Sequence, residues 1–340
     1  MHLLSLLAAF PALALSSPPP PLTLTESSTF KIVQFADLHT GEGEAEDWGP
    51  ESDRKTYEFL SSTVHLEEPD LVVFSGDQVT GLNVHYNATD YYQRLSDLLQ
   101  ETPHTLILGN HDAEPFVGNG DQSEIGAIST RSQLMVFDAA QPYSHSQLGP
   151  KSLLPAASSY IVDVLHPQTG AVAIQLVHLD SGGGGMPEEI YPNQVAWLQK
   201  ILAERRIKHD TNTPTLVFIH IPFAQMETIK KEGGECWGTE LDGVTPTNFD
   251  SGLFNLLEEF DEVRAVFSGH DHCNSFCCEV KKGLDLCFGR HSSFGGYGCE
   301  GDAEEIGARV VEMQVDERGE VGLETYLRMH DGRKIETHAL

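Results

Sequence analysis

Short apolar runs alternate with longer amphipathic stretches along most of the 340-residue chain. A continuous apolar run is typical of a buried strand, and apolar residues spaced three or four apart are typical of a helix that packs one face on a core. The apolar runs predict strands at residues 30–36, 71–74, 105–108, 160–165, 171–179, 215–219, 265–267, 284–288, 308–315 and 321–326.

The helical spacing occurs over residues 57–64, 91–99, 193–202 and 253–260. In the third of these stretches, Asn193 is the expected N-cap ahead of Val195. The alternation of strands and helices predicts an α/β fold in which helices cover a sheet. The polar, glycine-rich stretches 113–125 and 181–187 are expected to be loops.

Residues 1–16 have the pattern of a signal peptide. The apolar stretch 3–15 contains Ala12-Leu13-Ala14, which is a small-x-small cleavage sequence. Residues 17–29 are rich in proline and serve as a stiff spacer in this interpretation. Residues 30–340 are then expected to form a single domain of a secreted protein.

Six cysteines also favour an oxidising compartment. Five of them lie between residues 273 and 299, and their spacing does not select one disulfide pairing. A structural zinc site is the alternative, although the spacing matches no common zinc-binding pattern. Asn87, in the sequence Asn87-Ala88-Thr89, is a candidate glycosylation site in a secreted chain.

The net charge of −30 limits the classes of partner. An acidic surface lacks the cations that nucleic acid and anionic lipid require, so we expect neither nucleic acid nor a membrane as a partner. The same surface repels phosphorylated substrates at long range. A pocket for such a substrate would therefore need local positive charge, which bound metal ions supply.

Five of the predicted strands run into the same kinds of polar residue. Ligand sites in α/β sheets form at the carboxyl ends of strands, and glycines there let the backbone approach an ion or a phosphate closely. The residues that follow the five strands are Asp37 and His39, Asp77, Asn110 with His111 and Asp112, His220, and His270 and His272. Each motif alone is a weak signal, whereas the ordered set of five is highly specific.

This ordered set resembles the calcineurin-like metallophosphoesterase superfamily. Within it, the chain is similar to the small, non-purple branch of the purple acid phosphatase relatives of fungi and plants. Residues 265–272 (AVFSGHDH), 286–289 (LCFG) and 295–298 (GGYG) carry the similarity to that branch. The resemblance implies a four-layer α/β/β/α sandwich, in which two mixed β-sheets pack face to face between helices.

The resemblance also implies two metal ions. The first would be held by Asp37, His39, Asp77 and His272, and the second by Asp77, Asn110, His220 and His270, with Asp77 bridging. A ligand set of nitrogen and oxygen atoms suits iron, manganese or zinc. In the purple enzymes a tyrosine follows the Gly-Asp motif and binds ferric iron. Here Thr80 occupies that position and His39 can take the coordination place, so we expect no tyrosinate colour.

The implied activity is hydrolysis of phosphate monoesters, on a small molecule or a phosphoprotein, by in-line attack of a metal-bridging hydroxide. His111 is the candidate for stabilising the transition state or protonating the leaving group. Asp112 either orients His111 or raises the pKa of His111 by its charge, or else it has a turn or cap role.

Three other functions are considered. The main alternative is a phosphodiesterase or nucleotide hydrolase on the same scaffold. A non-catalytic secreted binding protein would be favoured by the loss of a ligand residue, and none is lost. A disulfide-stapled adhesion domain would leave the five motifs unexplained.

Several further residues near these motifs have open roles. His178 is expected in the core rather than in contact with metal ligands. Arg290 and His291 either contact substrate phosphate or lie on a surface loop, and Tyr160 and Tyr297 are expected to be ordinary core or rim aromatics.

Overall fold

The computed structural model describes residues 18–84, 88–114, 129–209, 213–299, 306–316 and 320–340. Within these residues the named strands form two mixed sheets. The first contains, in spatial order, β13 (Lys334–Ala339), β12 (Val321–Met329), β11 (Gly307–Val315), β1 (Thr29–Phe35), β2 (Leu71–Ser75) and β3 (His104–Ile107). The second contains β4 (Tyr160–Leu165), β5 (Val172–His178), β6 (Thr215–Phe218), β8 (Val263–Ser268), β10 (Leu284–Phe288), β9 (Cys277–Lys281) and β7 (Glu235–Trp237).

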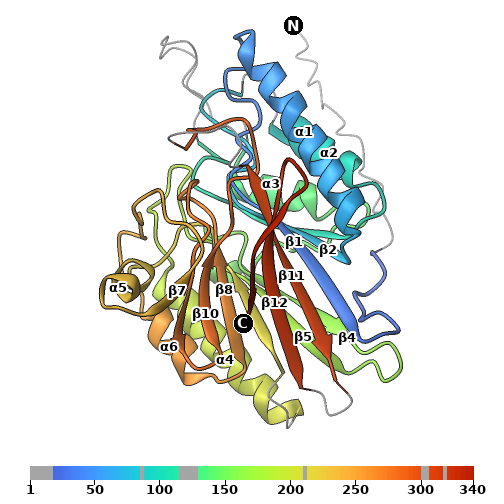
Figure 1. Ribbon diagram of the computed structural model, residues 1–340, viewed down its shortest axis with the longest axis vertical. Helices are drawn as coiled ribbons and strands as arrows, with labels where there is room; N and C mark the ends of the chain where they lie inside the picture. The colour runs from blue at the N-terminus through green and yellow to red at the C-terminus, as the bar shows by residue number, and fades with distance from the viewer. Residues whose placement is uncertain (1–17, 85–87, 115–128, 210–212, 300–305, 317–319) are drawn as a thin grey trace, which may run out of the picture.

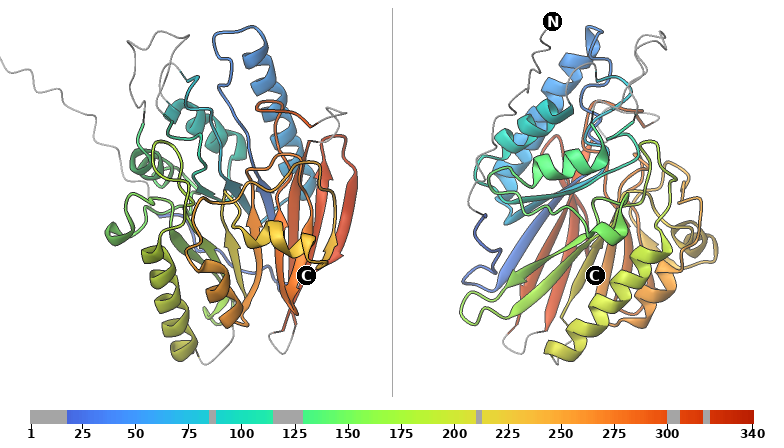
Figure 2. Two further views of the ribbon diagram at one scale, coloured as in Figure 1. Left: turned by 90° about the vertical axis from the view of Figure 1, so that its left-hand side faces the viewer. Right: turned by 180° about the vertical axis from the view of Figure 1, so that it is seen from behind.

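Helices cover the outer face of each sheet (Figure 1, Figure 2). The first sheet is covered by α1 (Trp48–Glu67), α2 (Ala88–Leu99) and α3 (Arg131–Asp138). The second is covered by α4 (Pro192–His209), α5 (Gln225–Lys231) and α6 (Leu253–Glu259), and a short 3-10 helix spans Lys151–Leu153. The layers follow the order helix, sheet, sheet, helix, which confirms the predicted fold class.

The strand pleat explains why the apolar runs are continuous. In β6, Leu216 and Phe218 are buried in the core between the two sheets, whereas Val217, and Ile219 directly after the strand, belong to a second core that includes side chains of α4 and α6. Successive side chains of a strand point to opposite faces. A strand covered on both faces therefore needs an apolar residue at every position.

Parallel pairing brings the polar strand ends together. β1, β2 and β3 are parallel neighbours in the first sheet, and β6 and β8 are parallel neighbours in the second. The two sheets also meet directly at this edge, because Nδ1 of His220 donates to the carbonyl of Ser75 at 2.9 Å. His220 follows β6 and Ser75 ends β2, so the end of one sheet lies against the end of the other.

Every predicted strand and helix has a counterpart in the structure, although α1 is longer than predicted. One detail was wrong: Asn193 lies inside α4 and does not cap it. Its side-chain amide instead donates to the carbonyl of Ser152 at 2.8 Å. The short elements α3, α5, β7, β9 and β13 were not predicted. Four of them contain no sustained apolar run, and the run at residues 134–137 in α3 is too short to establish a helical spacing.

Three disulfides join all six cysteines, which excludes a zinc site built on free thiolates. Cys277–Cys287 and Cys236–Cys278 each join facing residues of neighbouring strands. Cys273–Cys299 instead ties the loop after β8 to a loop near residue 299.

Two of the sequence predictions fall outside the described residues: the signal peptide at residues 1–16 and the glycosylation site at Asn87. Residues 115–125 of the first predicted loop also lie outside them. Residues 181–187 form a loop with one isolated bridge between Gly183 and Met186, as predicted. No helix in the described part of the chain is long and apolar enough to cross a membrane.

His178 is a core residue, as expected, and it gives the protein a predictable sensitivity to acid. Its imidazole is fully buried and stacks on the ring of Tyr160 with centroids 4.4 Å apart, and its Nε2 bonds the hydroxyl of Thr105 at 3.0 Å. Burial lowers the pKa of His178 to about 3. In the unfolded chain the same group titrates near pH ~6.5.

Between these two pKa values the unfolded chain binds a proton that the folded chain does not, so the free energy of unfolding should decrease as the pH falls below ~6.5. His178→Gln should reduce that pH slope by up to ~1.4 kcal/mol per pH unit between pH ~6 and pH ~4. Urea unfolding across this range measures the slope. His65→Gln, at an exposed position of α1, is the control. An unchanged slope in His178→Gln would contradict the assignment.

Candidate metal centre

Backbone hydrogen bonds join the loop that follows β1 to the loop that follows β2. The N–H of Asp37 donates to the carbonyl of Gly76 at 3.1 Å, and the N–H of His39 donates to the carbonyl of Asp77 at 2.9 Å. Four residues of the site have backbone φ angles in the left-handed region, which residues other than glycine rarely adopt. They are Asp37 (58°), His39 (47°), Asp77 (54°) and His270 (77°). Such strain costs about 1–3 kcal/mol per residue and clusters at functional sites.

Two glycines allow the closest approaches within the site. A Cβ atom at Gly76 would lie 2.2 Å from Nδ1 of His220, and one at Gly109 would lie 2.1 Å from Oδ1 of Asp77. Neither distance is compatible with a side chain. Gly76, which precedes Asp77, and Gly109, which precedes Asn110, are therefore required because the polar side chains of the site pack directly against them.

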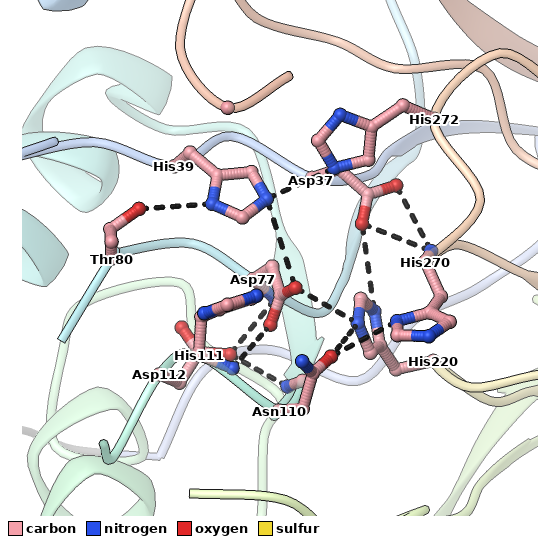
Figure 3. A network of polar contacts seen from close by, with 12 residues as sticks. Asp37, His39, Asp77, Thr80, Asn110, His111, Asp112, His220, His270 and His272 are labelled. Carbon is pink, nitrogen blue, oxygen red and sulfur yellow. Dashed lines mark hydrogen bonds and ion pairs between the residues drawn. The ribbon is translucent and has the colours of Figure 1, made fainter. Parts of the chain in front are cut away.

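The polar strand ends converge as two groups of side chains (Figure 3). In each group, one potential ligand atom from each residue lies within 4.8 Å of the others. The first group is Asp37, His39 and His272, and the second is Asp77, His220 and His270. The structure therefore brings together side chains that follow β1, β2, β6 and β8.

Asp77 lies between the two groups. Its Oδ2 atom is 3.1 Å from Nε2 of His220 and 3.8 Å from Nε2 of His39. The Oδ1 atom of Asn110 completes the second group, at 3.0 Å from Nε2 of His220 and 3.1 Å from Nδ1 of His270. All seven residues expected at the centre are thus brought together.

The chemistry of these atoms fits a cation. Nδ1 of His220 faces the carbonyl of Ser75, which can only accept, so Nδ1 keeps its proton in either form of the ring. When Nε2 loses its proton, as metal binding requires, its lone pair points at Asp77 Oδ2 and Asn110 Oδ1, which are also acceptors. Acceptors that face one another without a proton repel, and a metal ion between them removes the repulsion.

The electrostatics of the site lead to the same conclusion. Burial alone would raise the pKa of Asp77, but His220 and the other imidazoles hold it well below its usual range. Burial alone would lower the pKa of His220, but the charge of Asp77 raises it to about 9. Asp77 and His220 therefore bind one proton between them, at the point where the two side chains meet. A metal cation can replace that proton.

The imidazoles of His39 and His270 are suited to bind a metal ion as neutral ligands. Burial lowers the pKa of His39 well below its usual value and lowers the pKa of His270 to about 3. Nδ1 of His39 contacts the hydroxyl of Thr80 at 2.9 Å, while its Nε2 faces Nε2 of His272 at 3.1 Å. A neutral imidazole with one nitrogen held from outside presents the other as a metal ligand.

His111 lies at the open side of the centre, with its side chain 33% exposed. Its backbone N–H donates to Oδ1 of Asp77 at 2.8 Å, and its Nδ1 bonds Oε2 of Glu114 at 2.7 Å. Burial would lower the pKa of His111, but the bond to Glu114 and the charge of Asp77 raise it to about 9. The contacts of His111 with Glu114 and Asp77 therefore favour its protonated form beside both groups.

Asp112 does not orient His111, which corrects the first of its expected roles. Its buried carboxylate accepts the N–H groups of Asp77 at 2.9 Å, Gln78 at 2.8 Å and Gly109 at 2.6 Å, and the hydroxyl of Tyr92 at 2.9 Å. The turn role is the one observed, because Asp112 fixes the loop that carries Asp77.

Two residues with a part in the site were missed at the sequence level. Glu114 holds His111, and its spacing of three residues in one loop was the signal that could have found it. Arg131 is buried and donates to the carbonyls of Leu108 and Gly109 at 3.0 and 2.7 Å, just before Asn110. No local pattern identifies Arg131, since 22 residues separate it from Gly109.

The other expectations near the site are resolved by burial. Arg290 and His291 are both buried, so neither lies on a surface loop. Arg290 donates to the carbonyl of Cys273 at 2.7 Å, and the ring of His291 stacks on His272 with centroids 4.2 Å apart. Tyr160 is in the core, whereas Tyr297 is 50% exposed and stacks on His272.

Comparisons with known proteins find similarity in sequence and in fold. Residues 30–274 match the family described as calcineurin-like phosphoesterase. Probable inactive purple acid phosphatase 14 of Arabidopsis thaliana is 29% identical, over 87% of this chain and 78% of that protein. Phosphatase DCR2 of Saccharomyces cerevisiae is 28% identical, over 91% of this chain and 55% of that protein. Among solved structures, a dimetal phosphatase from Danio rerio shares the fold with a TM-score of 0.61 at 15% identity, covering 91% of this chain and 98% of that one.

Proposed function

Because this chain belongs to the calcineurin-like phosphoesterase family, we propose that it is a secreted phosphatase that holds two metal ions and hydrolyses phosphate monoesters. The observation that carries the proposal is the convergence of acceptor atoms from both sheets around Asp77. The three disulfides support secretion, because such bonds persist in oxidising compartments.

Each ion has its own group of ligands in this proposal. One ion is held by Asp37, His39 and His272 and the other by Asn110, His220 and His270, with Asp77 shared. When bound, such a pair of ions lowers the pKa of water and neutralises the charge of phosphate oxygens. The ligand set suits iron, manganese or zinc. Thr80 beside His39 provides no tyrosinate, so the metal-loaded protein should lack the purple colour.

His111 and Glu114 handle the proton of the leaving group. Glu114 holds Nδ1 of His111, which leaves Nε2 to donate to an oxygen of the substrate. The backbone N–H of His111 donates to Asp77, so the proton donor is positioned relative to the metal ligands. Asp112 contributes indirectly, because its carboxylate holds the loop on which Asp77 lies.

A monoester is the favoured substrate because it has one more non-bridging oxygen than a diester. Two ions, when bound, would stabilise the greater negative charge on the non-bridging oxygens of a monoester, while His111 contacts the leaving-group oxygen, and contacts to the developing charge lower the barrier. With full-length protein loaded with metal, we expect kcat/KM to be higher for 4-nitrophenyl phosphate than for bis(4-nitrophenyl) phosphate. A preference for the diester would favour the phosphodiesterase alternative and contradict the proposal.

The name of the Arabidopsis relative favours a second candidate, a binding protein that retains the site without turnover. The two candidates differ in one measurement. Protein that contains two metal ions per chain and hydrolyses neither ester across the range from acid to neutral pH would support the binding protein. Turnover that depends on added metal would support the phosphatase.

A further inference from the structure

The imidazole of His272 lies between two other rings. The ring of Tyr297 stacks on it almost in parallel, with centroids 3.8 Å apart and an interplanar angle of 6°. The ring of His291 covers the opposite face at 4.2 Å. His291 is buried, whereas half of Tyr297 is exposed, so Tyr297 forms the outer wall that holds His272 in place.

Tyr297 also fixes which nitrogen of His272 carries the proton. Nδ1 of His272 lies 2.8 Å from the backbone carbonyl of Tyr297, and a carbonyl can only accept. The proton is therefore on Nδ1, and the lone pair of Nε2 points toward His39 and the first group of ligands. A partner of this kind is what fixes the orientation of a metal-binding imidazole.

A second set of bonds connects the Tyr297 hydroxyl to the loop that carries His272. The backbone N–H of His272 donates to this hydroxyl at 3.0 Å, and the hydroxyl donates to Oδ2 of Asp242 at 2.9 Å. The same Oδ2 atom accepts the N–H of Cys273 at 3.0 Å. Asp242 thus joins Tyr297 to the residue that follows His272.

The disulfide Cys273–Cys299 closes this arrangement covalently. It joins the residue after His272 to the residue two positions beyond Tyr297, so the two loops cannot separate far. His220, in contrast, is fully buried at a strand end and is held by the carbonyl of Ser75. His220 of the second group therefore has a rigid support of its own, whereas His272 of the first group depends on a loop 25 residues away in the sequence.

We propose that Tyr297 and Asp242 are positioning residues that hold His272 in the orientation needed to bind the first metal ion. The inference rests on the proposed function insofar as that function places an ion at the first group. The side chain of Tyr297 holds the ring of His272 by stacking and the backbone of His272 through its hydroxyl. Asp242 holds the hydroxyl of Tyr297 and the N–H of Cys273 together.

Titration of metal-free, full-length protein with Co²⁺ tests this inference without relying on activity. Calorimetry gives the affinity of each site, and the visible absorption of Co²⁺ reports its coordination. Tyr297→Leu should weaken one of two bound ions by ~10–100-fold and leave the other unchanged. Tyr297→Phe keeps the stacked ring and the backbone carbonyl, so it should recover part of that affinity, and Asp242→Asn should resemble Tyr297→Phe.

Tyr326→Phe is the matched control, because the Tyr326 hydroxyl also donates to a carboxylate, that of Glu67 at 2.6 Å, but on β12. It should bind both ions as the wild type does. Equal affinities in Tyr297→Leu and wild type would overturn the inference, as would an equal loss at both sites. If Tyr297→Leu does not fold, Tyr297→Phe and Asp242→Asn decide between the same outcomes. Wild-type protein that binds two Co²⁺ ions without turnover contradicts only the proposed function, and wild-type protein that binds none overturns both.

Discussion

Replacing Asp77 with asparagine should remove both metal ions and reduce monoester turnover by at least ~10³-fold, equivalent to about 4 kcal/mol of transition-state stabilisation. Oδ2 of Asp77 lies within reach of His220 in one group and His39 in the other, so one carboxylate serves both. Asparagine keeps an oxygen that can accept the N–H of His111, which Asp77 accepts at 2.8 Å. The variant therefore removes the charge and retains the shape.

Metal content per chain, measured by elemental analysis, and kcat on 4-nitrophenyl phosphate check this result. Asp70→Asn is the matched control, because Asp70 also accepts a backbone N–H, from Lys31 at 2.7 Å, but just before β2 begins and not where it ends. The control should retain both ions. Asp77→Ala should resemble Asp77→Asn, and two ions bound in either variant at wild-type affinity would contradict a shared role for Asp77.

The candidate ligands could be proposed from the sequence because each one lies within four residues of the end of an apolar strand. Parallel strands place their carboxyl ends at one edge of a sheet, so the position of His220 or His270 follows once β6 and β8 are recognised. That helices cover a sheet follows similarly from the alternation of strands and helices. The sandwich of two sheets and the division of the ligands between two ions, in contrast, were implied by the resemblance to the phosphoesterase superfamily and not by local pattern.

The supporting residues could not be predicted, because their contacts join distant parts of the chain. Tyr297 reaches His272 from a loop without a periodic pattern, and Asp242 meets both only in the folded protein. Asp112 was recognised as a polar residue next to His111, but a backbone reversal turns its carboxylate toward the N–H groups of the loop that carries Asp77. Neighbouring positions in a turn point in different directions, which sequence spacing does not reveal.

His111→Ala should leave both metal ions bound while turnover falls by ~10²–10⁴-fold. The contact that joins residue 111 to Asp77 is made by the backbone N–H, and alanine retains it. What the variant loses is the imidazole, and with it the proton donor on the open side of the centre. Metal content equal to wild type together with reduced kcat would match this expectation, whereas unchanged kcat would remove His111 from the mechanism.

Glu114 offers a test of how His111 acts. Because its carboxylate contacts Nδ1 of His111 at 2.7 Å, Glu114→Gln should reduce kcat by less than His111→Ala does, since a neutral amide can still hold the ring. If Glu114 works only through His111, the double variant should be no slower than His111→Ala alone, which is the non-additivity expected of residues in one network. Independent, additive losses would show instead that Glu114 contacts the substrate in its own right, and the two side chains would then have separate roles in the reaction.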